Sequence, residues 1–71
     1  MTFLLIYDIP RNKNALLVRV WRKLKKMDAK KITNSVWSVE DDEKITAFHE
    51  IKEAINKAGG EAKIMKVVFI E

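Results

Sequence analysis

The stretch Thr2-Phe3-Leu4-Leu5-Ile6-Tyr7-Asp8-Ile9-Pro10 is an apolar run that ends at one carboxylate and is followed by a proline. A strand with one solvated face alternates apolar and polar residues, whereas positions 3–7 do not alternate. We therefore expect a strand over residues 2–8 that is covered on both faces. Helices of the same chain can cover one face, and we expect a second copy of the chain to cover the other.

The length of 71 residues fits a single domain over residues 1–71. Cores of this size usually need disulfides, a metal or oligomerisation for stability. The sequence has no Cys and one His, which excludes disulfides and fits a reducing cytoplasm. No basic segment precedes the first apolar run, and no stretch is long enough to cross a membrane. We therefore predict a cytoplasmic homodimer without a membrane partner.

Apolar residues recur at three- and four-residue spacing after the first strand, which predicts a helix. The helix is expected to begin at Asn12 or Asn14, either of which is a plausible N-cap, and to run to Met27. The positions that form its apolar face are Leu17, Val20, Trp21, Leu24 and Met27.

Two short strands are predicted next, over residues 30–32 and 35–39, joined by a turn at Thr33-Asn34. The acidic run over residues 40–43 is expected to open a second helix, because carboxylates complement the positive end of the helix dipole. Gly59-Gly60 is expected to end this helix. A last strand follows over residues 62–70, and its end is continuously apolar.

The resulting order, β-α-β-β-α-β, is that of the ferredoxin-like fold. This α+β fold has a four-stranded antiparallel sheet with both helices on one face. The other face would be bare in a single chain. We therefore expect a dimer joined through the open sheet faces, through the strand edges near residues 67–70, or through both.

Charge is distributed unevenly along the chain. Residues 1–39 contain nine basic and two acidic residues, a net charge of +7, whereas residues 40–71 have a net charge of −3. A basic half of this kind indicates a polyanionic partner. Basic residues in and around the first helix are spaced to form one ridge opposite its apolar face. The candidate nucleic-acid-binding residues are Arg11, Lys13, Arg19, Arg22, Lys23, Lys26 and Lys30, with Lys25 and Lys31 extending the ridge. The alternative is a solvated helix face.

The sequence resembles three related families. The segments Leu5-Ile6-Tyr7-Asp8-Ile9 and Ser35-Val36-Trp37 are similar to the CRISPR-associated Cas2 proteins and to the Cas2-like module of phenylacetate-type repressors. Residues 19–29 and 58–62 resemble the N-terminal domain of chromate-resistance regulatory proteins. The resemblance implies a ferredoxin-like dimer associated with nucleic acid, and it leaves open a place in a larger protein assembly.

The Cas2 resemblance also implies a role for Asp8 as a catalytic residue of a metal-dependent endonuclease. Two Asp8 side chains related by a two-fold axis would share one Mg²⁺ or Mn²⁺ ion. The alternative is that Asp8 accepts hydrogen bonds from the following turn. Nothing else in the sequence supplies a second carboxylate or a general base near Asp8.

Three aromatic residues are candidates for contacts with bases or with a second copy of the chain. Trp21 and Trp37 are possible stacking platforms, although core or dimer-interface packing is the more common role of such residues. Tyr7 is expected in the dimer interface, with its hydroxyl at the edge. Three functions are therefore open: a nucleic-acid-binding or scaffolding dimer, a nuclease, and a dimerisation module without nucleic-acid contact.

Overall fold

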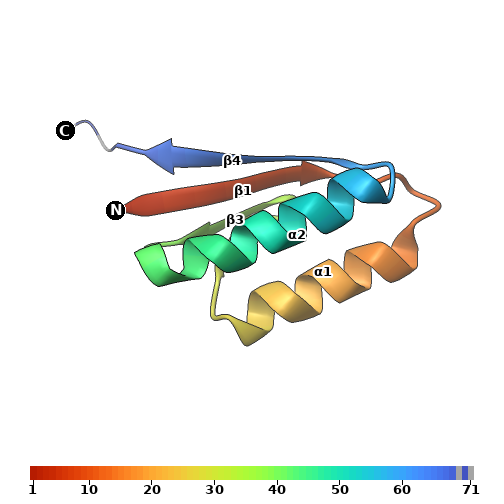
Figure 1. Ribbon diagram of the computed structural model, residues 1–71, viewed down its shortest axis with the longest axis horizontal. Coiled ribbons are helices and arrows are strands. Elements are labelled where there is room, and N and C mark those ends of the chain that lie inside the picture. Colours follow the sequence, from red (N-terminus) through yellow and green to blue (C-terminus); the bar gives the residue numbers. More distant parts are fainter. Residues whose placement is uncertain (69, 71) are drawn as a thin grey trace.

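The structure is a computed structural model that describes residues 1–68 and residue 70. The elements in chain order are β1 (Thr2–Asp8), α1 (Asn14–Lys26), β2 (Lys30–Thr33), β3 (Val36–Val39), the 3-10 turn η1 (Asp42–Lys44), α2 (Ile45–Lys57) and β4 (Glu61–Val67). The strands form one sheet in the order β2-β3-β1-β4, and neighbouring strands are antiparallel. Both helices lie on one side of this sheet (Figure 1). The predicted ferredoxin-like α+β fold is confirmed.

The core lies between the sheet and the two helices. Alternate residues of a strand point to opposite faces, and Leu5 and Tyr7 of β1 point toward the helices and are buried. Leu5 lies opposite Trp37 of β3, which is also buried. The helices contribute buried apolar residues at three- and four-residue spacing, namely Leu16, Val20 and Leu24 of α1 and Phe48, Ile51 and Ile55 of α2. The predicted apolar face of the first helix is thus largely confirmed, and Leu16 is a core residue that the sequence pattern missed.

α1 begins at Asn14, one of the two predicted starts, but its N-cap differs from the prediction. The N-cap position is occupied by Lys13, whose side chain makes no capping hydrogen bond. The amide of Lys13 instead donates to the carbonyl of Pro10 over 2.9 Å, so a backbone turn leads into the helix. The predicted N-caps Asn12 and Asn14 are therefore wrong.

Other boundaries shift by a few residues. The carboxylate of Asp41 accepts a 2.9 Å hydrogen bond from the amide of Glu43, so the acidic run caps η1 and α2 begins only at Ile45. The hairpin turn lies at residues 34–35, one residue later than predicted. The last strand ends at Val67, which corrects the predicted end at residue 70. Phe69 lies outside the described residues.

The sheet face away from the helices carries a row of apolar side chains. The register places Leu4 opposite Met65 and Ile6 opposite Val36 on this face. Leu4, Ile6 and Val36 are only half-buried, and Met65 is 51% exposed. The lack of alternation in β1 is therefore real, and one of its faces is uncovered in the single chain.

Candidate nucleic-acid interface

α1 is a strongly cationic helix. Its 13 residues include five basic and no acidic side chains. Arg19, Arg22 and Lys26 are spaced three and four residues apart, so their side chains are neighbours on the helix surface, and all three are exposed. We call these three residues the cationic face of α1. Because its buried positions lie on the other side of the helix, the cationic face is directed toward solvent.

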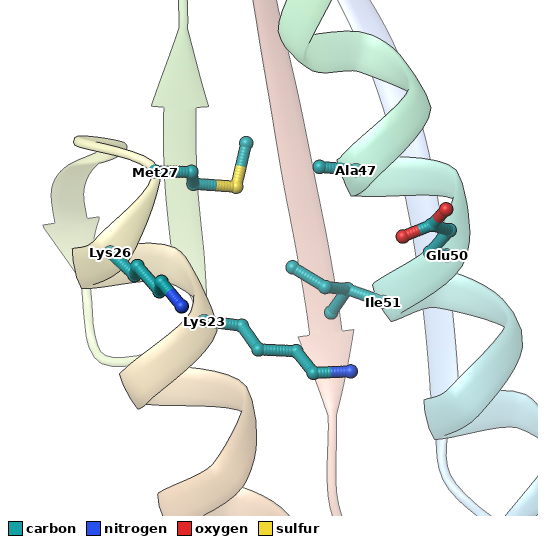
Figure 2. Close-up of a pocket in the computed structure, with 6 residues that line it drawn as sticks. All are labelled: Lys23, Lys26, Met27, Ala47, Glu50 and Ile51. Carbon is teal, nitrogen blue, oxygen red and sulfur yellow. The ribbon is translucent and has the colours of Figure 1, made fainter.

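Lys23 has a different environment from Arg19 and Arg22. It lines a groove of about 230 Å³ between α1 and α2, together with Lys26 of the cationic face and with Met27, Ala47, Glu50 and Ile51. Figure 2 shows the side chain of Lys23 extending from α1 across this groove toward α2. The aliphatic part of a lysine commonly covers apolar surface in this way. The structure therefore separates Lys23 from Arg19 and Arg22, which the sequence pattern had grouped with it.

The remaining predicted cations lie on other elements. Arg11 and Lys13 are exposed in the segment before α1. Because α1 has no side-chain N-cap, its first amides and these two cations give this end of the helix a positive potential. Lys30 belongs to β2 and lines a cavity of about 340 Å³ with Asp28, Glu40, Asp41 and other residues. Its charge therefore lies among carboxylates and not on the cationic face of α1.

Asp8 ends β1, and the antiparallel register places it directly opposite Glu61 of β4. Directly opposed residues have their Cβ atoms about 4.5–5.5 Å apart, and two like charges there are unfavourable. Sequence reasoning missed Glu61 as a neighbour of Asp8. The predicted fold pairs the first and last strands antiparallel. This pairing was the signal that could have identified Glu61 as a neighbour of Asp8.

A divalent cation needs more ligands than this pair supplies. Mg²⁺ takes six oxygen ligands in near-octahedral geometry. Within the described part of the chain, no group of three or more His, Cys, Asp or Glu residues could hold a metal ion. Asp8 and Glu61 of one chain therefore do not fit the expected Mg²⁺ or Mn²⁺ site by themselves.

An aromatic cluster joins β1, β3 and α1. The hydroxyl of Tyr7 accepts 3.0 Å hydrogen bonds from the indole N–H groups of Trp21 and Trp37, and it donates a 2.8 Å hydrogen bond to the carbonyl of Asn34. Burial raises the pKa of Tyr7 above its usual value, and the two indole hydrogen bonds oppose this shift. Tyr7 is thus a core residue on the helix side of the sheet, and its predicted place in a dimer interface is wrong.

The two tryptophans of this cluster differ in exposure. Trp37 is 3% exposed and belongs to the core, so it cannot stack on a base. Trp21 is half-buried, and the ammonium group of Lys31 lies 5.6 Å from the centroid of its ring. Of the two tryptophans, Trp21 is therefore the one that presents aromatic surface to a ligand.

One comparison with known proteins identifies the family. The family model described as "Protein ChrB, N-terminal" matches residues 17–70. The chain belongs to this family. The ChrB N-terminal match supports the resemblance to chromate-resistance regulatory proteins and places the chain among the domains of regulatory proteins. A link to Cas2 is not shown by the ChrB N-terminal match. No curated protein matches the chain.

The match covers most of the structural core and the proposed interface. It begins at Leu17 in the first half of α1 and includes the cationic face, α2 and the strands β2, β3 and β4. Asp8 lies outside the matched residues. The ChrB N-terminal family is therefore supported by the segment that carries the cations and not by the carboxylate that ends β1. No helix in the described part of the chain has the length and hydropathy that a membrane crossing requires.

Proposed function

We propose that this chain is a homodimeric nucleic-acid-binding module of a regulatory protein, in which α1 of each copy contacts the phosphate backbone. The observation that carries the proposal is the composition of α1, with five basic residues and no acidic residue in 13 positions. A helix whose cations served only solubility would commonly carry acidic residues at three- or four-residue spacing from them. Uncompensated cations are instead what phosphate binding requires.

The proposed contacts are electrostatic and independent of base sequence. Arg19 and Arg22 are the strongest candidates because a guanidinium group donates two parallel hydrogen bonds to a phosphate. Lys26 continues the same face, and Arg11 and Lys13 extend it beyond the start of the helix. Contacts of this type position a protein on nucleic acid and carry no sequence information.

The homodimer is proposed from the open face of the sheet. Ile32 is 53% exposed and Met65 is 51% exposed on this face. A hollow of about 380 Å³ lies beside them, lined mainly by apolar groups that include Leu4, Ile32 and Val67. Apolar surface of this kind, concentrated on one face, favours burial against a partner.

A second copy of the chain presents the same apolar face. A two-fold axis would bury the two faces against each other, which is the arrangement of an isologous dimer interface.

Variants of α1 test the proposal directly. We expect the double variant Arg19→Ala/Arg22→Ala to bind a single-stranded oligothymidylate at least about tenfold more weakly than the unchanged chain in fluorescence anisotropy at low salt. The matched control is Lys57→Ala/Lys66→Ala, which removes two exposed cations outside α1 and is expected to retain the affinity. Equal affinities of the α1 variant and the unchanged chain would overturn the proposal. The same titration distinguishes the proposed nucleic-acid-binding module from a dimerisation module without nucleic-acid contact. A dimerisation module would not bind the oligonucleotide at any salt concentration.

A second candidate function is a metal-dependent nuclease, favoured by the position of Glu61 opposite Asp8. A metal site would need further carboxylates from a second copy. The test is cleavage of single- and double-stranded nucleic acid with Mg²⁺ or Mn²⁺ by the unchanged chain and by Asp8→Asn and Glu61→Gln. Cleavage that both variants retain would exclude this candidate.

A further inference from the structure

A cavity of about 440 Å³ lies where β1 ends and the β2–β3 hairpin turns. One wall is apolar and is formed by Ile9, Leu17 and Trp21, and polar groups come from Asp8, Asn34 and Ser35. Cavities that bind small organic groups commonly measure about 300–1,000 Å³ and combine an apolar lining with a few polar groups. The size and lining of this cavity are therefore those of a ligand site.

The ring of Trp21 has a fixed orientation in this wall. Its indole N–H donates a 3.0 Å hydrogen bond to the hydroxyl of Tyr7, which is itself held by Trp37 and by the carbonyl of Asn34. The ammonium group of Lys31 lies over the ring, 5.6 Å from its centroid, and Lys31 is not among the residues that line the cavity. An aromatic ring that is already oriented stacks on a planar ligand at a small entropic cost.

The polar groups of the cavity select among planar ligands. The carboxylate of Asp8 is exposed and accepts hydrogen bonds. Two adjacent N–H donors on one planar edge suit its two oxygens, and guanine presents such an edge with its N1–H and N2–H groups. Thymine and adenine lack this pair of donors.

Cations beside Trp21 indicate that the ligand carries phosphate. Lys25 follows Trp21 by four residues and therefore lies on the same side of α1. Lys31 lies 5.6 Å from the Trp21 ring centroid. An aromatic surface next to cations is the arrangement that proteins use for single-stranded nucleic acid, where the bases are free to stack.

We propose that this cavity binds an unpaired guanine base of a single-stranded nucleic acid, stacked on Trp21 and hydrogen-bonded to Asp8. This inference rests on the proposed function and specifies its substrate class. It gives the module a base preference that the cationic face of α1 cannot provide.

The test uses guanosine 5′-monophosphate and adenosine 5′-monophosphate as probes. In ¹H–¹⁵N NMR titrations of the unchanged chain, we expect the guanine nucleotide to shift the indole resonance of Trp21 and to bind about five- to a hundredfold more tightly than the adenine nucleotide, the range of one bidentate contact. In Asp8→Asn the ratio of the affinities for the guanine and adenine nucleotides is expected to fall toward one. In Trp21→Leu, binding of both nucleotides is expected to be lost. No shift at Trp21, or equal affinities of the two nucleotides for the unchanged chain, would overturn the inference.

The two proposals can fail separately. The oligothymidylate used to test the cationic face of α1 contains no guanine, so its salt-dependent binding does not depend on the cavity. If the oligothymidylate binds and the guanine nucleotide does not, the proposed function stands and the guanine site is excluded. If neither binds, the proposed function is excluded as well. Circular dichroism of the variants establishes that they are folded, and the titration of the unchanged chain does not depend on them.

Discussion

The indole N–H of Trp37 donates a 3.0 Å hydrogen bond to the hydroxyl of Tyr7, which lies 30 positions earlier in the chain. The bond is buried and joins the side chains of the two central strands, β3 and β1. The same hydroxyl orients Trp21 of α1. One phenol therefore ties together the sheet and the helix that carries both the cationic face and the wall of the proposed guanine site.

Removal of this hydroxyl is expected to destabilise the protein. Tyr7→Phe leaves the indole N–H groups of Trp37 and Trp21 without their acceptor and removes the bond to Asn34. A buried donor without a partner costs about 1–3 kcal/mol, so we expect the free energy of unfolding to fall by roughly 2–4 kcal/mol, mostly from the buried N–H of Trp37. Urea denaturation measures this change. The control Trp21→Phe keeps Tyr7 paired with Trp37 and is expected to cost less, and a larger loss in the control would contradict the account.

Stability is also expected to depend on the ionisation of Tyr7. Its pKa is raised above the usual value of 10.0, mainly because burial disfavours the phenolate. The folded state therefore holds this proton more tightly than the unfolded state. The contribution is complete below about pH 10 and is lost as the pH rises through the pKa of the folded state. Urea midpoints between pH 8 and 11 should fall more steeply for the unchanged chain than for Tyr7→Phe, and parallel curves would contradict this assignment.

Much of the fold follows from patterns that the sequence displays. The three- and four-residue spacing of apolar residues located the first helix, the acidic run and Gly59-Gly60 bracketed the second, and the unbroken apolar run of residues 3–7 located β1. The boundaries were less predictable because backbone turns replaced the expected side-chain caps. Lys13 begins α1 through a turn with Pro10, and a 3-10 turn takes up the acidic run before α2. Periodicity reports which residues are buried, but it does not report which hydrogen bond ends an element.

The two glycines that follow α2 are expected to tolerate substitution differently. A Cβ atom at Gly60 would lie 2.8 Å from the carbonyl oxygen of Asp8 and 2.8 Å from Cγ2 of the buried Ile55. Neither group can move easily, and we expect Gly60→Ala to cost about 1–3 kcal/mol. At Gly59 there is open space, but its φ of +92° disfavours side chains, at a cost of about 1–2 kcal/mol.

A second substitution separates the two causes. Asn tolerates positive φ better than Ala. We therefore expect Gly59→Asn to be milder than Gly59→Ala, whereas Gly60→Asn should be at least as harmful as Gly60→Ala. The melting temperatures of the four variants show which substitutions destabilise the protein most. Equal losses in Gly59→Asn and Gly60→Asn would contradict the close contact between Gly60 and the end of β1.

The candidate site was less predictable than the fold. The exposure of Arg19, Arg22 and Lys26 follows from the helical period, since they lie opposite the apolar positions. The helical period does not predict whether a long side chain extends along a groove, as those of Lys23 and Lys26 do. It does not apply to Lys30, which lies on a strand. The pairing of Tyr7 with two tryptophans depends on tertiary contacts that no local pattern displays.

The dimer is expected to depend on the open sheet face. Met65→Glu places a carboxylate beside Leu4 on this face of each copy, so the dimer interface would contain two like charges. We therefore expect the dimer dissociation constant to rise at least about tenfold. Sedimentation equilibrium measures it. Val18→Glu, at another exposed apolar position on α1, is the matched control and should leave the dimer unchanged. A monomeric unchanged chain at micromolar concentration would contradict the proposed assembly.

The most direct test of the central claim is the salt dependence of binding to a single-stranded oligothymidylate. Each phosphate contact contributes about −0.7 to the slope of the logarithm of the association constant against the logarithm of the salt concentration. With three contacts from the cationic face of α1, we expect a slope of about −2 per chain, and Arg19→Ala/Arg22→Ala should reduce its magnitude by about 1.4. A slope near zero, or one that this variant leaves unchanged, would contradict the account.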